Sequence, residues 1–181
     1  MVRRYRTHPD SAPSRKTAPT LKRCVEIVRQ VRPDIVITHA PADYMVDHEM
    51  TSKLVRSACF GAPAANFLTS AIEPAAAIER IPHLYYADPI EGKDPLGDDV
   101  APALLVDISS VIDTKEQMLA CHASQREWLR AHHGMDQYIA SMKEWGATRG
   151  KQLGVGYAEG FRQHLGHAYP QNNVIGELLG T

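Results

Sequence analysis

The sequence predicts an α/β fold in which a parallel sheet is flanked by helices, and three observations lead to it. Apolar side chains recur at helical spacing over residues 20–31, β-branched residues fill positions 35–38, and helical spacing returns from Met50 onward. This helix–strand–helix order makes up most of a parallel α/β unit. With 181 residues, 44% apolar and 23% charged, the chain is long enough and apolar enough for one domain with a core.

Charge and cysteine content argue against several classes of protein. The net charge of -1 argues against a general binder of nucleic acids or membrane surfaces. No apolar run approaches the roughly 20 residues that span a bilayer, and no apolar segment of a secretory signal follows the arginine-rich start. The three cysteines are far apart, which argues against disulfides and against a cysteine zinc site. We therefore expect a reducing, cytoplasmic location.

The first elements lead into one short strand. Residues 1–19 are rich in proline and basic side chains and predict an irregular segment, whereas residues 20–181 predict one domain without internal repeats. Pro33 ends the first helix, because proline disfavours helical geometry in the residue before it. Residues 35–38, Ile-Val-Ile-Thr, have the β-branched apolar character of a buried strand.

The later elements are expected to alternate between strands and helices. A long helix should begin with Asp113 or Thr114 as its cap and end at Gly134. We interpret His122, on the apolar side of this helix, as a satisfied core histidine, and His132-His133 as a complement to its carboxyl end. Strands are expected at 83–87, 104–108 and 155–161, further helices at 136–145 and near the carboxyl terminus, and a loop at 88–102.

Polar side chains gather directly after the strand at 35–38. His39, Asp43, Tyr44, Asp47 and His48 follow its carboxyl end, where open α/β sheets keep their ligands. Histidine is the commonest metal ligand, and its second ring nitrogen needs an orienting acceptor. His48 is therefore the candidate metal ligand, and three such ligands with an open water position would suit a hydrolytic zinc centre. The alternative is that Asp47 caps the helix and that His48 is a surface histidine without a metal.

The segment RPDIVITHAPADYMVDHEMTSKLVRSA resembles a conserved block of the PIG-L/LmbE-like de-N-acetylases, and the similarity runs on from about Thr20. These are zinc hydrolases that remove acetyl groups from N-acetylglucosamine-type substrates. The resemblance implies a Rossmann-like fold, His48 as a zinc ligand and Asp47 as the group that orients a neighbouring histidine. It also implies an N-acetylated amino sugar or glycoconjugate as substrate and a possible homo-oligomer, with neither nucleic-acid binding nor a membrane span.

Two departures from the family pattern limit these expectations. Many members carry a histidine where this chain has Met45, which cannot stabilise an oxyanion, so His39 and Tyr44 join Asp47 as catalytic candidates. The family's first block, an apolar strand and A-H-P-D-D-E, supplies two zinc ligands and the base. Here His8-Pro9-Asp10-Ser11 lacks that strand and the second aspartate. We therefore expect an amino-terminal truncation that is inactive alone and binds zinc weakly.

Other readings remain open. The chain is alternatively a non-catalytic relative that acts as a sugar-binding or structural subunit. A metal-free α/β hydrolase has little support, because the sequence contains no G-x-S-x-G motif. Within the resemblance, further residues are expected near the pocket or across a subunit interface: His122, Tyr157 and Glu159 for the pocket, and His164, His167 and Tyr169 for the interface.

Overall fold

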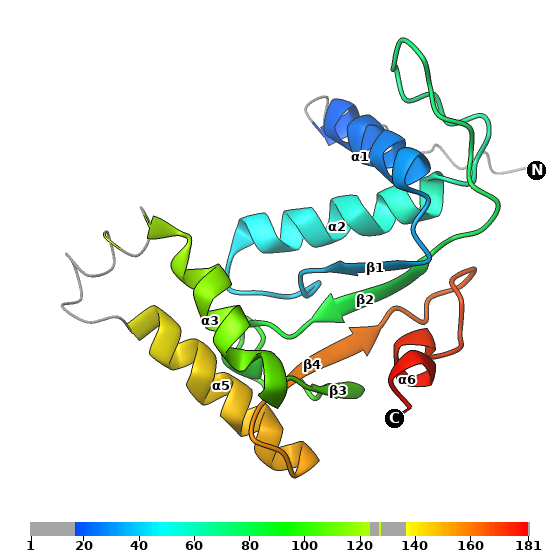
Figure 1. The fold of residues 1–181 in the computed structure, drawn as a ribbon. Coiled ribbons are helices and arrows are strands. Elements are labelled where there is room, and N and C mark those ends of the chain that lie inside the picture. The colour runs from blue at the N-terminus through cyan, green and yellow to red at the C-terminus, as the bar shows by residue number, and fades with distance from the viewer. Residues whose placement is uncertain (1–16, 124–126, 128–136, 181) are drawn as a thin grey trace, which may run out of the picture.

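The computed structural model describes residues 17–123, 127 and 137–180, and its centre is a four-stranded sheet in the order β1-β2-β4-β3 (Figure 1). β1 (Ile35–Thr38) pairs in parallel with β2 (His83–Ala87). β4 (Ala158–Gln163) runs antiparallel to β2 and to β3 (Leu104–Asp107). The predicted α/β class is confirmed, but the sheet is mixed, and only the β1–β2 pair has the expected parallel direction.

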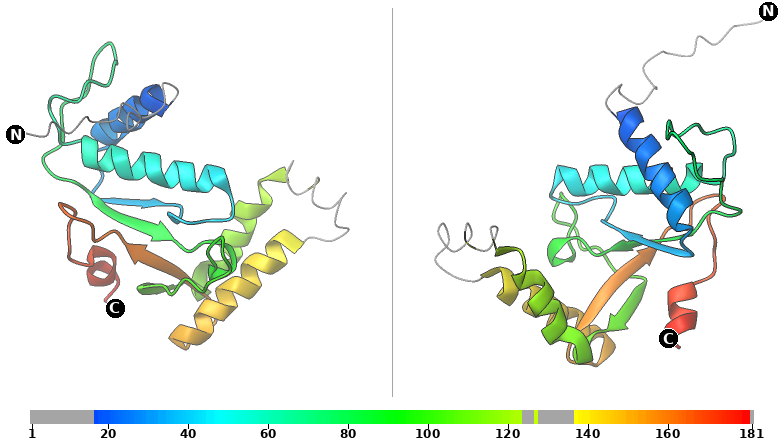
Figure 2. Two further views of the ribbon diagram at one scale, coloured as in Figure 1. Left: turned by 180° about the vertical axis from the view of Figure 1, so that it is seen from behind. Right: turned by 45° about the horizontal axis from the view of Figure 1, so that its top comes forward.

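Helices lie on both sides of this sheet. Figures 1 and 2 show α1 (Thr17–Val31) and α2 (Val46–Gly61) on one side, over β1 and β2. On the other side, α5 (Gln137–Leu153) packs mainly against β4, with α3 (Ile112–Ala120) next to it. The short α6 (Val174–Leu179) follows near the carboxyl terminus. None of the helices in the described part of the chain is long and apolar enough to cross a membrane.

The connection from α1 to β1 explains why the strand begins where it does. Arg32 adopts a left-handed backbone conformation with φ 51°, and its amide donates to the Val28 carbonyl at 2.9 Å. This is the usual way to end a helix, and Pro33 then prevents its continuation. The strand lies at one edge of the sheet and is only partly buried, since Ile37 is 54% exposed. The expected full burial of residues 35–38 is therefore wrong.

The core is divided between the two faces of α2. Val25, Val28, Ala58 and Ile78 belong to a cluster between α1 and α2. A second cluster joins α2 to the sheet and the carboxyl-terminal segment, and it comprises Cys59, Leu84, Tyr86 and Tyr169, with Val36 packed against it. Because side chains alternate along a strand, Val36 faces α2, and its neighbour Ile37 must point to the opposite face.

Several predicted boundaries differ from the structure. β1 and β2 are confirmed residue for residue, and α5 extends eight positions beyond the expected end at Trp145. β4 begins at Ala158 rather than Val155, because the Val155 amide bonds back to the Gly150 carbonyl at 2.9 Å and turns the chain after α5.

The predicted long helix differs most. α3 begins at Ile112 after a 3-10 turn, Ser109–Val111, and its N-cap Val111 offers no side-chain bond, so the expected capping by Asp113 or Thr114 is wrong. It ends at Ala120, and the amides of Cys121 and His122 turn back to carbonyls three residues earlier. His122 is exposed, which corrects its assignment to the core. Gly134 and His132-His133 lie outside the described residues.

Candidate functional site

The structure brings His39 and His48 together at the carboxyl end of β1. His39 directly follows the strand, and His48 lies in the first turn of α2. Their rings are stacked, with centroids 4.1 Å apart and planes inclined by only 7°. The loop between them is short enough for the strand end and the helix start to lie side by side. The two imidazoles that the sequence singles out are therefore direct neighbours.

Asp43 fixes the orientation of His48. Its buried carboxylate accepts from His48 Nδ1 at 3.1 Å and from the Met45 amide at 3.0 Å. A carboxylate can only accept, so Nδ1 carries a proton, and in the neutral ring Nε2 has the free lone pair. Histidines that bind metals are usually held in this way by an acceptor on the second nitrogen. The ring is 31% exposed at its side chain, so Nε2 has access to solvent or a ligand.

The remaining candidates in this segment take other positions. Asp47 is exposed and accepts from the backbone amide of His48 at 3.1 Å. The carboxylate that contacts the His48 ring is therefore Asp43, not Asp47 as the resemblance implied. Tyr44 presents its ring edge to His48, with centroids 6.1 Å apart, and is 59% exposed. Met45 precedes the helix without a side-chain capping bond.

The described residues do not complete a metal centre. They contain no group of three or more His, Cys, Asp or Glu side chains that could hold a metal ion. His48 Nε2 offers one ligand position, and the stacked ring of His39 lies in a nearly parallel plane. A catalytic zinc takes three protein ligands. His8 and Asp10, considered in the sequence, lie outside the described residues.

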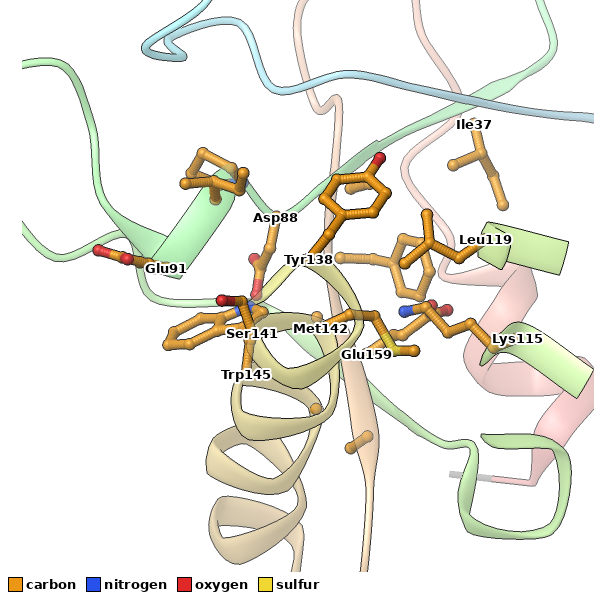
Figure 3. Close-up of a pocket in the computed structure, with 17 residues that line it drawn as sticks. Ile37, Asp88, Glu91, Lys115, Leu119, Tyr138, Ser141, Met142, Trp145 and Glu159 are labelled. Atoms are coloured by element: carbon orange, nitrogen blue, oxygen red, sulfur yellow. The ribbon is translucent and has the colours of Figure 1, made fainter. Parts of the chain in front are cut away.

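A cavity of about 730 Å³ lies on the face of the sheet opposite α2 (Figure 3). Ile37 contributes to its wall, as the alternation along β1 requires. Apolar side chains from β4, α3 and α5 supply most of the lining, among them Leu119, Met142, Trp145 and Phe161. This size is typical of pockets for small molecules.

One residue of the cavity wall, Asp88, belongs to a buried ion pair. Arg149 Nε donates to Asp88 Oδ2 at 2.7 Å, and the two side chains are 5% and 6% exposed. Arg149 also donates to the Val100 carbonyl at 3.0 Å and lies over the Trp145 ring, 4.5 Å from its centroid. Asp88 Oδ1 is enclosed and has no hydrogen-bond partner among the described residues. Burial raises the pKa of Asp88, and the Arg149 guanidinium opposes that shift.

Sequence reasoning missed Asp88 although a signal was present. Asp88 follows β2 immediately, just as His39 follows β1, and these two strands are parallel neighbours. Polar groups after adjacent parallel strands reach the same edge of the sheet. Gly160 on β4 confirms how tightly the carboxylate is held, since a Cβ at that position would collide with it. Arg149 carried no comparable signal, because its partner Asp88 lies 61 positions away in the chain.

The carboxyl-terminal histidine candidates lie apart from both places. His164 Nδ1 is 3.0 Å from the Tyr86 hydroxyl, and its ring packs edge to face on Tyr169 at 4.2 Å between centroids. Burial and the nearby Arg56 lower the pKa of His164. Tyr169 is buried and donates to the Arg56 carbonyl at 2.7 Å, whereas His167 is exposed. His164 and Tyr169 thus pack within this chain, and contacts across a subunit interface stay a prediction.

Residues 2–59 match the PIG-L family, described as GlcNAc-PI de-N-acetylase, and this range contains the whole segment from His39 to His48. No curated protein sequence matches the chain.

Three solved structures share the fold. GalB, the 4-carboxy-2-hydroxymuconate hydratase from Pseudomonas putida KT2440, is 23% identical, with a TM-score of 0.61 over 91% of this chain and 65% of its own. The conserved protein TT1542 from Thermus thermophilus is 24% identical, with the same TM-score and coverage. The N,N'-diacetylchitobiose deacetylase from Pyrococcus horikoshii is 20% identical, with a TM-score of 0.59 over 87% of this chain and 56% of its own. The chain therefore spans 65% or less of the length of these proteins, and at such identities the likeness concerns the fold alone.

Proposed function

We propose that this chain, whose residues 2–59 match the PIG-L family, serves the hydrolytic removal of an N-acetyl group from an N-acetylglucosamine-type substrate. The match of residues 2–59 to a de-N-acetylase family carries this proposal. The fold alone does not choose the reaction, since it is shared by a hydratase and a deacetylase. The matched range includes the segment in which Asp43 holds His48.

Each residue of this segment has a distinct proposed task. His48, held by Asp43, presents Nε2 as one metal ligand, and a zinc ion in such a centre acts as a Lewis acid that activates water. His39 and Tyr44 lie against the His48 ring and carry the N–H and O–H groups that Met45 lacks. They are the candidates to stabilise an oxyanion or protonate the departing amine. Asp47 faces solvent at the start of α2, where a carboxylate interacts favourably with the positive end of the helix dipole.

A second function has one observation in its favour. The described residues offer a single well-oriented imidazole rather than three metal ligands. A sugar-binding or structural relative that has lost the metal centre would retain the scaffold and need no further ligands. The two functions differ in one measurable respect, which is whether any acetate is released in a His48-dependent manner.

The test combines metal binding with acetate release. Zn²⁺ is titrated into the purified chain by calorimetry, and acetate is measured after incubation with N-acetylglucosamine and N,N'-diacetylchitobiose. We expect weak zinc binding that His48→Ala abolishes, because one imidazole alone cannot hold zinc tightly. His167→Ala, which removes an exposed histidine elsewhere, is the matched control. Zinc binding that is identical in the two variants would contradict the role of His48. Acetate release that His48→Ala abolishes would favour the deacetylase over the non-catalytic relative.

A further inference from the structure

The cavity between α5 and the sheet is a site in its own right. None of His39, Asp43 and His48 contributes to its wall, and it lies on the face of the sheet opposite α2. Its volume of about 730 Å³ falls in the range of small-molecule pockets. A ligand in this space would contact α3, α5 and β4 rather than the loop after β1. Binding in this cavity therefore requires none of the residues assigned to the proposed deacetylation.

Lys115 on α3 and Glu159 on β4 form the polar contact of this cavity. Figure 3 shows their side chains meeting beside Leu119. Lys115 Nζ donates to Glu159 Oε1, and each side chain is 36% exposed. Among the described residues, Glu159 Oε1 is the sole partner of the ammonium, so protons remain for a ligand. The pair thus presents a donor and an acceptor next to each other.

The charged groups around the cavity compensate one another. Lys115 is paired with Glu159, and Asp88 is paired with Arg149. Glu91, the remaining charged residue of the wall, is exposed, and Figure 3 shows it turned away from the other labelled side chains. Burying an ion beside groups that are already neutralised would leave its charge uncompensated, which is unfavourable. The cavity therefore favours an uncharged ligand.

The rest of the wall suits an apolar ring. Trp145, Phe161, Leu119 and Met142 provide aromatic and aliphatic surface, and the Tyr138 ring lies beside them (Figure 3). Aromatic walls of this kind contribute binding through apolar contact and stacking. A ligand that fills the cavity should therefore combine a ring body with a small polar group.

We propose that this cavity binds an uncharged ligand whose apolar ring carries a hydrogen-bond acceptor beside a donor, as in a secondary amide or a vicinal diol. The acceptor of the ligand receives a hydrogen bond from Lys115 Nζ, and the donor of the ligand gives one to the Glu159 carboxylate. An amide spans the pair with its carbonyl oxygen and its N–H, and a diol spans it with two hydroxyl groups. A ligand that lacks the donor satisfies only Lys115 and offers no hydrogen bond to the remaining lone pairs of the Glu159 carboxylate.

A matched series of ring compounds tests the chemistry. Binding of N-cyclohexylacetamide, cyclohexyl acetate, cyclohexylammonium and trans-1,2-cyclohexanediol is measured by ligand-observed NMR. The amide should bind at least about tenfold more tightly than the ester, which lacks only the N–H, and than the cation. Tighter binding of the diol than of the amide would identify a hydroxylated ligand as the better fit. Equal affinity of the amide and the ester would overturn the proposal.

Two variants of α5 test the location without touching buried groups. Ser141 is exposed and belongs to the cavity wall, so Ser141→Phe should fill the space and reduce amide binding at least about tenfold. Ala140→Phe, at the adjacent exposed position outside the wall, is the matched control and should bind normally. Glu159→Gln should weaken the amide more than the ester. Unchanged binding in Ser141→Phe would overturn the proposal, and normal binding in His48→Ala would separate this site from the metal ligand.

Discussion

The two polar regions of this protein are built in opposite ways. At the end of β1, Asp43 holds His48 across only five positions of sequence, and the histidine remains open to solvent. On the other face of the sheet, Asp88 holds Arg149 across 61 positions, and both side chains are almost fully buried. The first region is a local loop and helix start, whereas the second needs the strand, the loop after it and α5 in their final places.

This difference predicts how each region responds to change. A local, partly buried contact such as that of Asp43 with His48 stabilises a side-chain orientation and contributes little to the fold. A buried, long-range ion pair contributes little net stability while both partners are present, but the loss of one partner leaves a charge stranded in the interior. Substitutions in the two regions should therefore separate function from stability.

The largest effect is expected when the buried pair is broken on one side. Arg149→Met should lower the free energy of unfolding by about 3–5 kcal/mol, because Asp88 then lies buried without its counter-charge. The measurement is urea unfolding monitored by circular dichroism. The double variant Asp88→Asn with Arg149→Met should recover part of the loss, since it removes both charges. If Arg149→Met lowers the free energy of unfolding by less than about 1 kcal/mol, the buried pair behaves like an exposed one and the proposed difference between the two regions is wrong.

A smaller effect is expected at Gly160, which lies against the Asp88 carboxylate. A Cβ at this position would collide with that carboxylate, so Gly160→Ala should lower the free energy of unfolding by about 1–3 kcal/mol. Gly97→Ala is a control for the change of residue type away from the sheet, although its φ of 89° adds backbone strain of its own. In urea unfolding, a stability of Gly160→Ala equal to wild type would mean that Asp88 can move freely.

The same contrast explains what the sequence revealed. The loop region could be predicted because its residues are contiguous: a β-branched run, two histidines and a helix start identify the end of a strand. The resemblance implied that Asp47 orients a neighbouring histidine, but Asp47 is exposed and accepts from the His48 backbone amide, whereas Asp43 contacts the His48 ring.

The cavity could not be predicted in this way. Lys115 and Glu159 become neighbours only through the sheet order and the packing of α3. Neither order nor packing has a local signature, and the antiparallel placement of β4 between β2 and β3 was not anticipated from alternating strands and helices. The extent of α3 was overestimated for a related reason, since helical spacing continues past Ala120 in the sequence.

The loop region should show its effect in ligand binding rather than in stability. Asp43→Asn keeps the shape of the side chain but weakens the bond to His48 Nδ1, and so loosens the ring. We expect zinc affinity to fall about 10–100-fold, as is typical when the acceptor behind a metal-binding histidine is changed. Calorimetry measures the affinity, with Asp47→Asn as the matched control that leaves the ring contact intact. An equal loss of zinc affinity in both variants would contradict a specific orienting role for Asp43.

The smallest effect should come from pH, at a histidine that belongs to neither region. Burial lowers the pKa of His164, so the unfolded chain takes up a proton more readily than the folded one. The stability that neutral His164 contributes is therefore present above its unfolded pKa of about 6.5 and is lost as the pH falls below that value. Urea unfolding between pH 5 and 8 should show this decline, and His164→Phe should flatten it, whereas His167→Phe should not, because His167 is exposed. A decline that persists unchanged in His164→Phe would mean that another group titrates in this pH range.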